Sequence, residues 1–172
     1  MKLKELIESR YSVRAYLSQA VEEDKINYIL ECARLAPSAC NNQPWKFFVI
    51  RNQSVISCIQ ESYNREWFKS APVHIVVCKD SSVSWKRTGS DNKDFGDVDV
   101  AIAAEHICLA AAEIGLGTCW VCNFKPDVLT EVLNLSPNLE PIVIFPLGYI
   151  DKNKSISPEK KRKPLSDITE WI

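Results

Sequence analysis

The stretch Asp97–Trp120, DVDVAIAAEHICLAAAEIGLGTCW, predicts a long helix, a glycine stop and the start of a strand. No Pro or Gly interrupts Asp97–Ile114, and many of its residues are alanine, the best helix former. Asp97 and Asp99 suit the positive end of the helix dipole, and Gly115 suits a left-handed cap. Apolar residues occur on most sides of this helix, which is typical of a buried one. We expect a core helix of roughly 27 Å that could also line a site or a subunit interface.

The length and charge of the chain limit what the protein can be. A chain of 172 residues is predicted to fold as a single domain, residues 1–172. Its 21 basic and 22 acidic residues balance, so no bulk charge attracts nucleic acid. No apolar run approaches the roughly 18 residues of a membrane span, and the charged start MKLKELIESR is unlike a signal peptide. We expect a cytoplasmic protein with small-molecule substrates and with neither nucleic-acid nor membrane partners, its seven cysteines being reduced.

Helices and strands alternate irregularly along the rest of the chain. Hydrophobic spacing predicts further helices at residues 3–7, 23–35, 55–59 and 126–133. Apolar and β-branched runs predict strands at residues 46–51, 73–78, 118–122 and 141–150. The polar stretch Ser81–Gly96 is long enough to be a lid or a substrate loop. Together these elements predict an α+β sandwich in which helices flank a mixed sheet of four to five strands.

Two basic segments can bind an anion. Arg10, Ser12 and Arg14 place two guanidinium groups and a hydroxyl within five residues, and guanidinium groups pair phosphate oxygens bidentately. The cluster Lys160–Lys163 near the C-terminus adds further cations. Each segment has an ordinary alternative, since surface arginines and solvated basic tails are common, and the tail also fits a nuclear-localisation signal.

The most specific segment is Ala36–Trp45, APSACNNQPW, which combines small, amide and ring side chains in one loop. It resembles the corresponding loop of the FMN-dependent nitroreductase family. The segments RYSVR from Arg10, GLG from Gly115, PLGY from Pro146 and RKPL from Arg162 follow the order and spacing of the short family members. The resemblance covers essentially the whole chain.

The resemblance implies a nitroreductase-like homodimer with an FMN site at the subunit interface, each site built from both chains. The cofactor-binding residues that it implies are Arg10, Tyr11, Ser12, Arg14, Pro37, Ser38, Ala39, Asn41, Gln43, Asn64, Trp120, Cys122, Asn123, Lys160 and Arg162. No metal site is implied, and no side chain is implied as catalytic because the flavin carries the chemistry.

Different parts of this set have different implied roles. Arg10, Ser12 and the tail pair of Lys160 and Arg162 would hold the phosphate end of FMN. Arg14 would approach the pyrimidine edge, where a cation would stabilise the anionic reduced flavin. The loop residues would reach the flavin of the partner chain. Asn64 would contact the polar edge of the flavin. Trp120 would pack on the ring, with the backbone amides at Cys122 and Asn123 facing N5 and O4.

The Cys119-Trp120-Val121-Cys122 segment offers an alternative chemistry. A Cys-x-x-Cys pair can be a redox dithiol or half of a zinc site. Here it follows a helix and enters a predicted strand, so the two thiols would point to opposite faces and a disulfide would be strained. No second close Cys or His pair supplies further zinc ligands.

The predicted function is an FMN-dependent oxidoreductase. It would take a hydride from NADH or NADPH and reduce a nitroaromatic, a quinone or a related acceptor by a ping-pong mechanism. A flavin-binding sensor or store without turnover needs the same cofactor site and stays open as an alternative. A thiol oxidoreductase that uses Cys119 and Cys122 is the third hypothesis.

Overall fold

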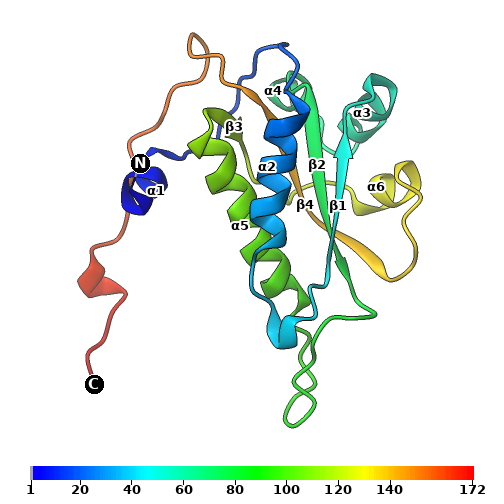
Figure 1. Ribbon diagram of the computed structural model, residues 1–172, viewed down its shortest axis with the longest axis vertical. Helices are drawn as coiled ribbons and strands as arrows, with labels where there is room; N and C mark the ends of the chain where they lie inside the picture. The colour runs from blue at the N-terminus through cyan, green and yellow to red at the C-terminus, as the bar shows by residue number, and fades with distance from the viewer. Residues whose placement is uncertain (1) are drawn as a thin grey trace.

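The computed structural model describes residues 2–172 and shows one four-stranded sheet between two layers of helices (Figure 1). The strands lie in the order β1-β2-β4-β3, and neighbouring strands are antiparallel. They are β1 (Trp45–Ile50), β2 (Val73–Asp80), β3 (Leu116–Thr118) and β4 (Leu139–Tyr149). Four strands are within the expected number, and the expected α+β sandwich is confirmed.

The sheet is less mixed than the sequence predicts. Every pair of neighbouring strands is antiparallel, and the parallel pairing is an isolated bridge between Ser12 and Thr118. The physical reason lies in the chain path. Strands β2 and β3 do run in the same direction, joined by a helical crossover, but β4 lies between them and is antiparallel to both.

Alternation along β2 divides the core between the two faces of the sheet. Ile75 and Val77 pack in the cluster on the side of α2 (Glu23–Arg34) and α5 (Gly96–Glu113). Val76 and Cys78 point to the opposite face, because successive side chains of a strand alternate. A strand buried on both faces reads as the continuous apolar run seen in the sequence.

The helices cover the sheet as two layers. In Figure 1, α2 and α5 lie in front of the strands, and α3 and α6 lie on the other side of β1 and β4. The remaining helices are α1 (Leu3–Ser9), α3 (Gln53–Gln60), the single turn α4 (Glu66–Lys69) and α6 (Pro126–Val132). The short 3-10 helices η1 (Ala39–Asn41) and η2 (Leu165–Asp167), like α4, have too few residues to show a periodic pattern in the sequence.

Helix α5 is the predicted core helix, with one qualification. It ends at Glu113, and Gly115 has φ of +80°, so the left-handed stop is confirmed. Its buried residues face the sheet and α2. The opposite side carries apolar residues that are exposed or half-exposed in the single chain, namely Val98, Ala101, Ile102, Leu109 and Ala112.

The strand that follows α5 differs from its predicted position. It was expected at residues 118–122, whereas β3 covers Leu116–Thr118 and the next contact is an isolated bridge between Val121 and Ile144. Position 117, inside the strand, requires glycine, because a Cβ there would come within 2.8 Å of Val13 Cγ2. The glycine thus admits the N-terminal segment beside β3, where Val13 N donates to Thr118 O at 2.9 Å. No helix within residues 2–172 is long and apolar enough to cross a bilayer.

Candidate functional site

The N-terminal basic segment is held against β3 by its backbone. Helix α1 ends at Ser9, and Arg10 begins an extended segment that bridges from Ser12 to Thr118. Arg10 Nε lies 3.9 Å from Glu105 Oε1 on α5, and the Arg10 side chain is only 20% exposed. Within the described part of the chain, this long ion pair leaves most of the guanidinium donors free for another anion.

The C-terminal tail brings two more cations to the same place. Lys160 Nζ donates to the carbonyl oxygen of Ile7, in α1, at 2.6 Å. Burial and the charges of Arg10 and Arg162 lower the pKa of Lys160. Arg10, Lys160 and Arg162 are therefore near one another, although Glu8 and Glu105 partly offset their charge. Such a cluster fits a phosphate, whose dianion would neutralise it.

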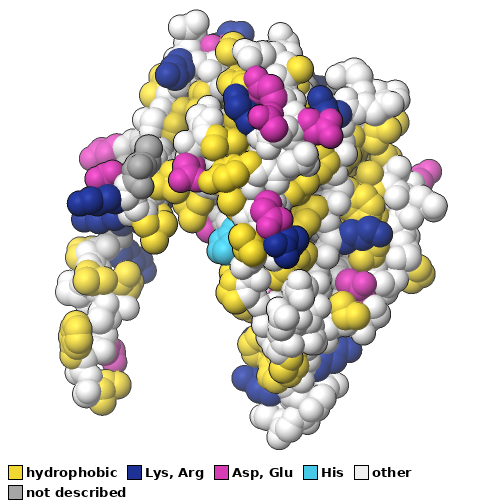
Figure 2. All heavy atoms as spheres, viewed as in Figure 1, with side chains coloured by type: hydrophobic (Ala, Val, Ile, Leu, Met, Phe, Trp, Pro, Cys, Tyr) yellow, Lys and Arg dark blue, Asp and Glu magenta, His cyan; other side chains and the backbone are white. Residues whose placement is uncertain are grey.

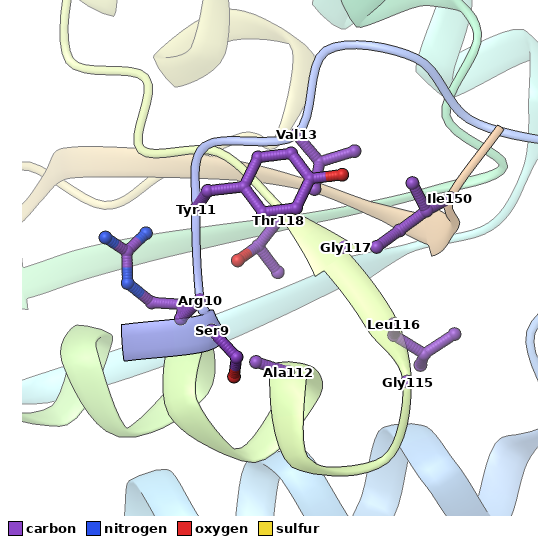
Figure 3. Close-up of a pocket in the computed structure, with 10 residues that line it drawn as sticks. All are labelled: Ser9, Arg10, Tyr11, Val13, Ala112, Gly115, Leu116, Gly117, Thr118 and Ile150. Carbon is purple, nitrogen blue, oxygen red and sulfur yellow. The ribbon is translucent and has the colours of Figure 1, made fainter. Parts of the chain in front are cut away.

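A small cavity adjoins the basic cluster (Figure 3). Its volume is about 220 Å³, and its lining includes Arg10, Tyr11, Thr118 and Gly117. In the close-up the Tyr11 ring lies over β3 near Thr118, and the Arg10 side chain points away from the Gly115–Gly117 end. The volume is below the roughly 300–1,000 Å³ of ordinary small-molecule sites, so this cavity alone does not hold a nucleotide cofactor.

A second group of expected residues, Arg14 and Asn64, lies near the aromatic residues Trp67 and Tyr63. The Arg14 guanidinium lies 5.8 Å from the centre of the Trp67 ring, which meets the Tyr63 ring edge to face. Asn64 is exposed next to these aromatic residues, in a polar hollow lined also by Lys125. Arg14 and Trp67 line one hollow, whereas Asn64 and Lys125 line another. Tyr63, which precedes Asn64 and contacts the Trp67 ring, connects the two.

The segment after β3 is attached to the residues beside Asn64. Lys125 N donates to Ser62 O at 3.0 Å, which joins the residues beside Asn64 to those that follow Cys122 and Asn123. Trp120 is half-buried, with its ring 5.3 Å from that of Phe145 on β4. Cys122 and Asn123 are both exposed.

The loop from Pro37 to Gln43 has an unusual backbone. Cys40, Asn41 and Gln43 have φ of 53°, 55° and 52°, the left-handed region that non-glycine residues rarely adopt. Each such residue costs on the order of 1 kcal/mol, so the surroundings must hold the loop in place. Ser38 does part of this, because its Oγ accepts from Gln43 N at 2.9 Å.

Asp99, on α5, also holds this loop and was not among the expected site residues. Its Oδ1 accepts from Ala39 N at 2.9 Å, and the residue is 3% exposed. Within the described residues, Asp99 Oδ2 has no hydrogen-bond partner. The sequence does carry a signal, since an acid between Val98 and Val100 interrupts an apolar helix, but the helix dipole alone also accounts for an acid at this position.

The long polar stretch Ser81–Gly96 forms a hairpin beside the loop. Lys86 and Asp94 pair as an antiparallel bridge, and the Trp85 and Phe95 rings lie 5.4 Å apart. Asn42 Nδ2 donates to Val83 O at 2.9 Å, which attaches the hairpin to the loop. The hairpin projects from the end of the molecule at which α5 begins (Figure 1).

In one chain the loop group is separate from the basic cluster. The loop group lies at the start of α5, beside Asp99. The basic cluster lies further along the helix, where Arg10 pairs with Glu105 and lines a cavity with Ala112. Along the helix axis, Asp99 lies about 9 Å from Glu105 and about 20 Å from Ala112. The expected residues therefore do not surround one complete site within a single chain.

The thiols do not form a reactive pair. Cys119 is buried and Cys122 is exposed, and both are free thiols. Burial raises the pKa of Cys119, with Arg14 acting against it, and burial also raises the pKa of Cys122. Reactive dithiols have lowered pKa values instead. Among residues 2–172, no group of three or more His, Cys, Asp or Glu side chains is arranged to hold a metal ion.

Comparison with known proteins identifies the class to which this fold and these residues belong. A sequence model described as "Nitroreductase family" matches residues 7–63 and 54–149. A crystal structure of a nitroreductase family protein from Clostridium difficile is 39% identical, with a TM-score of 0.91, covering 99% of this chain and 98% of that one. The chain belongs to the nitroreductase family.

The names of two curated relatives indicate the reaction class. A protein of Methanothermobacter thermautotrophicus, named provisionally as an NADH dehydrogenase/NAD(P)H nitroreductase, is 34% identical over 89% of this chain and 80% of its own length. An FMN reductase [NAD(P)H] of Bacillus subtilis is 29% identical over 96% of this chain and 71% of its own. The family, the fold and the expected class of enzyme, an NAD(P)H-dependent oxidoreductase, are confirmed.

Proposed function

We propose that the protein is an FMN-dependent oxidoreductase that oxidises NADH or NADPH and reduces a nitroaromatic, a quinone or a related acceptor. The observation that carries the proposal is the convergence of Arg10, Lys160 and Arg162 from opposite ends of the chain. Three cations at one place fit the phosphate of FMN, and family membership supplies the chemistry that goes with it.

The residues present fit this cofactor along its length. Arg10, Ser12, Lys160 and Arg162 would bind the phosphate end. Arg14, stacked on Trp67, would direct its charge towards the pyrimidine edge, where reduction places negative charge. Backbone amides near Cys122 and Asn123 would hydrogen-bond the polar atoms of the ring, and Trp120 would support its face.

When bound, FMN supplies the hydride acceptor and donor, so the protein's task is to bind and orient both substrates. A donor and an acceptor that use the same face of the flavin must bind in turn, which gives ping-pong kinetics. The raised pKa of Cys122 argues against a thiol intermediate. It also disfavours the alternative of a dithiol oxidoreductase.

The active form is proposed to be a homodimer. In one chain the loop group lies at the start of α5, and the basic cluster lies beside its middle, at Glu105. Two copies related by a two-fold axis, with their α5 helices antiparallel, would place the loop of one copy beside the basic cluster of the other. Each flavin site would then contain residues of both chains.

Two exposed apolar surfaces support this assembly. The first is the side of α5 with Val98, which is 49% exposed, and Leu109. The second is the tail after Lys160, which extends away from the body of the chain (Figures 1 and 2). Its Leu165 and Trp171 are 72% and 94% exposed. Exposed apolar surface of this kind is typical of protein interfaces.

The function is tested with the purified protein reconstituted with FMN. We expect NADH or NADPH to bleach the visible absorbance of the flavin, and a nitroaromatic or a quinone to restore it. A flavin that binds but is not reduced by either donor would support the sensor or storage alternative. A protein that binds no FMN would refute the proposal.

The assembly is tested by sedimentation equilibrium at low protein concentration. The parent is expected to sediment as a dimer of the 19.5 kDa chain and to lose FMN when it dissociates. Leu109→Glu should weaken both properties, whereas Leu17→Glu, at an exposed leucine outside α5, should weaken neither. A monomer that retains FMN would contradict the shared site.

A further inference from the structure

We infer that Asp99 is a positioning residue that holds the loop Ser38–Gln43 in the conformation that the flavin needs. The inference rests on the proposed function, which brings this loop to the flavin of the partner subunit. It adds a residue that neither the sequence motifs nor the comparisons assign to the site.

The first observation is the contact itself. Asp99 Oδ1 accepts the Ala39 amide at 2.9 Å, and so attaches the loop to the rigid first part of α5. A carboxylate is favoured in the first turns of a helix, and it accepts a stronger hydrogen bond than a neutral group does. The Asp99 carboxylate therefore attaches the loop to a rigid part of the helix.

The second observation is the strain in the loop. Cys40, Asn41 and Gln43 adopt left-handed backbone conformations directly after the anchored residue. Strained conformations persist only where the surrounding structure enforces them. Without the contact to Asp99, we expect the segment to relax towards ordinary backbone angles, and its amides would no longer face a fixed direction.

The third observation is the burial of the acid. Asp99 is 3% exposed, and its Oδ2 has no partner among the described residues. A buried polar atom without a partner is unfavourable, and such atoms are rare in folded proteins. Packing alone would favour an apolar residue at this position, as at Val100 and Ala103, which share the buried side of the helix.

The test compares four variants. Asp99→Ala removes the acceptor, and Asp99→Glu keeps the charge but moves the acceptor by one methylene. Asp99→Asn keeps the acceptor in place without the charge. Asp97→Asn is the matched control, because it removes a carboxylate of the same helical turn that is 65% exposed and pairs with Lys79 instead.

The first measurement needs no cofactor. Hydrogen exchange of the peptide covering residues 36–45 should be faster in FMN-free Asp99→Ala and Asp99→Glu than in the parent. It should stay near the parent value in Asp99→Asn and Asp97→Asn. Exchange that is unchanged in Asp99→Ala would overturn the anchoring role, and this result does not depend on whether FMN binds.

The second measurement separates positioning from simple stabilisation. The Kd for FMN should rise at least tenfold in Asp99→Ala and Asp99→Glu, stay within threefold in Asp99→Asn, and stay unchanged in Asp97→Asn. At saturating FMN, the visible circular dichroism of the flavin should change only in the first two variants. A lower melting temperature with unchanged Kd and flavin spectrum would overturn the inference, whereas a parent that binds no FMN would refute the proposed function itself.

Discussion

Lys160 and Ile7 are joined by a hydrogen bond of 2.6 Å from the lysine Nζ to the isoleucine carbonyl oxygen. This contact fastens the C-terminal tail to α1 just before Arg10, although the two residues are 153 positions apart in the chain. It therefore creates the basic cluster, which neither end of the chain could form alone.

We expect Arg10→Ala and Arg162→Ala to weaken FMN binding without unfolding the protein. Each variant removes a charge-assisted contact to the phosphate, so Kd should rise roughly ten- to hundredfold. FMN per protomer after dialysis and a fluorescence titration measure the loss. Lys161→Ala is the matched control, because Lys161 is an exposed neighbour outside the expected set. If both arginine variants keep FMN as well as the control does, the phosphate assignment is wrong.

Gly117→Ala is expected to destabilise the fold where the N-terminal segment meets β3. The added Cβ would come within 2.8 Å of Val13 Cγ2 and 2.9 Å of Ile150 Cγ1. Val13 is 1% exposed and cannot move freely, so the loss should be roughly 1–3 kcal/mol. Urea unfolding measures it. Gly89→Ala serves as the control, since nothing lies within 4 Å of the Cβ position there, and equal losses in both variants would contradict the packing argument.

His74 is expected to make stability depend on pH in the mildly acidic range. Burial lowers the pKa of this histidine from 6.5 to about 4, and its Nε2 lies 3.2 Å from Phe68 O. Between these values the unfolded chain binds a proton that the folded chain excludes, so stability is fully present above pH 6.5 and falls as the pH drops towards 4. The loss should approach about 3 kcal/mol.

Urea unfolding of the parent and of His74→Gln between pH 4 and 7.5 checks this prediction. Carboxylates whose pKa is lowered, among them Glu22, Glu31, Asp80 and Asp94, also lose stability as the pH falls towards 4, so the contribution of His74 is the difference between the parent and variant profiles. The variant is expected to be less stable at pH 7.5 but to show a flatter pH profile. A variant that retains the slope of the parent would exclude His74 as its source.

Blocking thiols is expected to leave turnover largely intact. Iodoacetamide should modify the exposed Cys40, Cys58 and Cys122 before the buried Cys119, and the double variant Cys119→Ser/Cys122→Ser should still oxidise NADH or NADPH. The reason is that the raised pKa values of Cys119 and Cys122 keep both thiols protonated and weakly nucleophilic. Complete loss of activity in the double variant, with FMN still bound, would instead favour the thiol mechanism.

The sequence by itself determines the features that depend on local pattern. Alanine content and the missing Gly and Pro specify α5, and Gly115 specifies where it stops, because its left-handed φ is costly for other residues. The apolar run of β2 specifies a strand buried on both faces. The loop motif and the spaced arginines specify the family, as the comparisons confirm.

The tertiary structure alone decides which of these features meet. The hydrophobic periodicity does not encode that β4 lies between β2 and β3. This position makes all neighbouring strands antiparallel, although a mixed sheet was expected. It also does not encode that Lys160 reaches Ile7, or that Asp99 holds Ala39 across 60 residues of sequence. Such contacts depend on the packing of the whole core, because a side chain's own neighbours in sequence do not reveal the group that burial will bring against it.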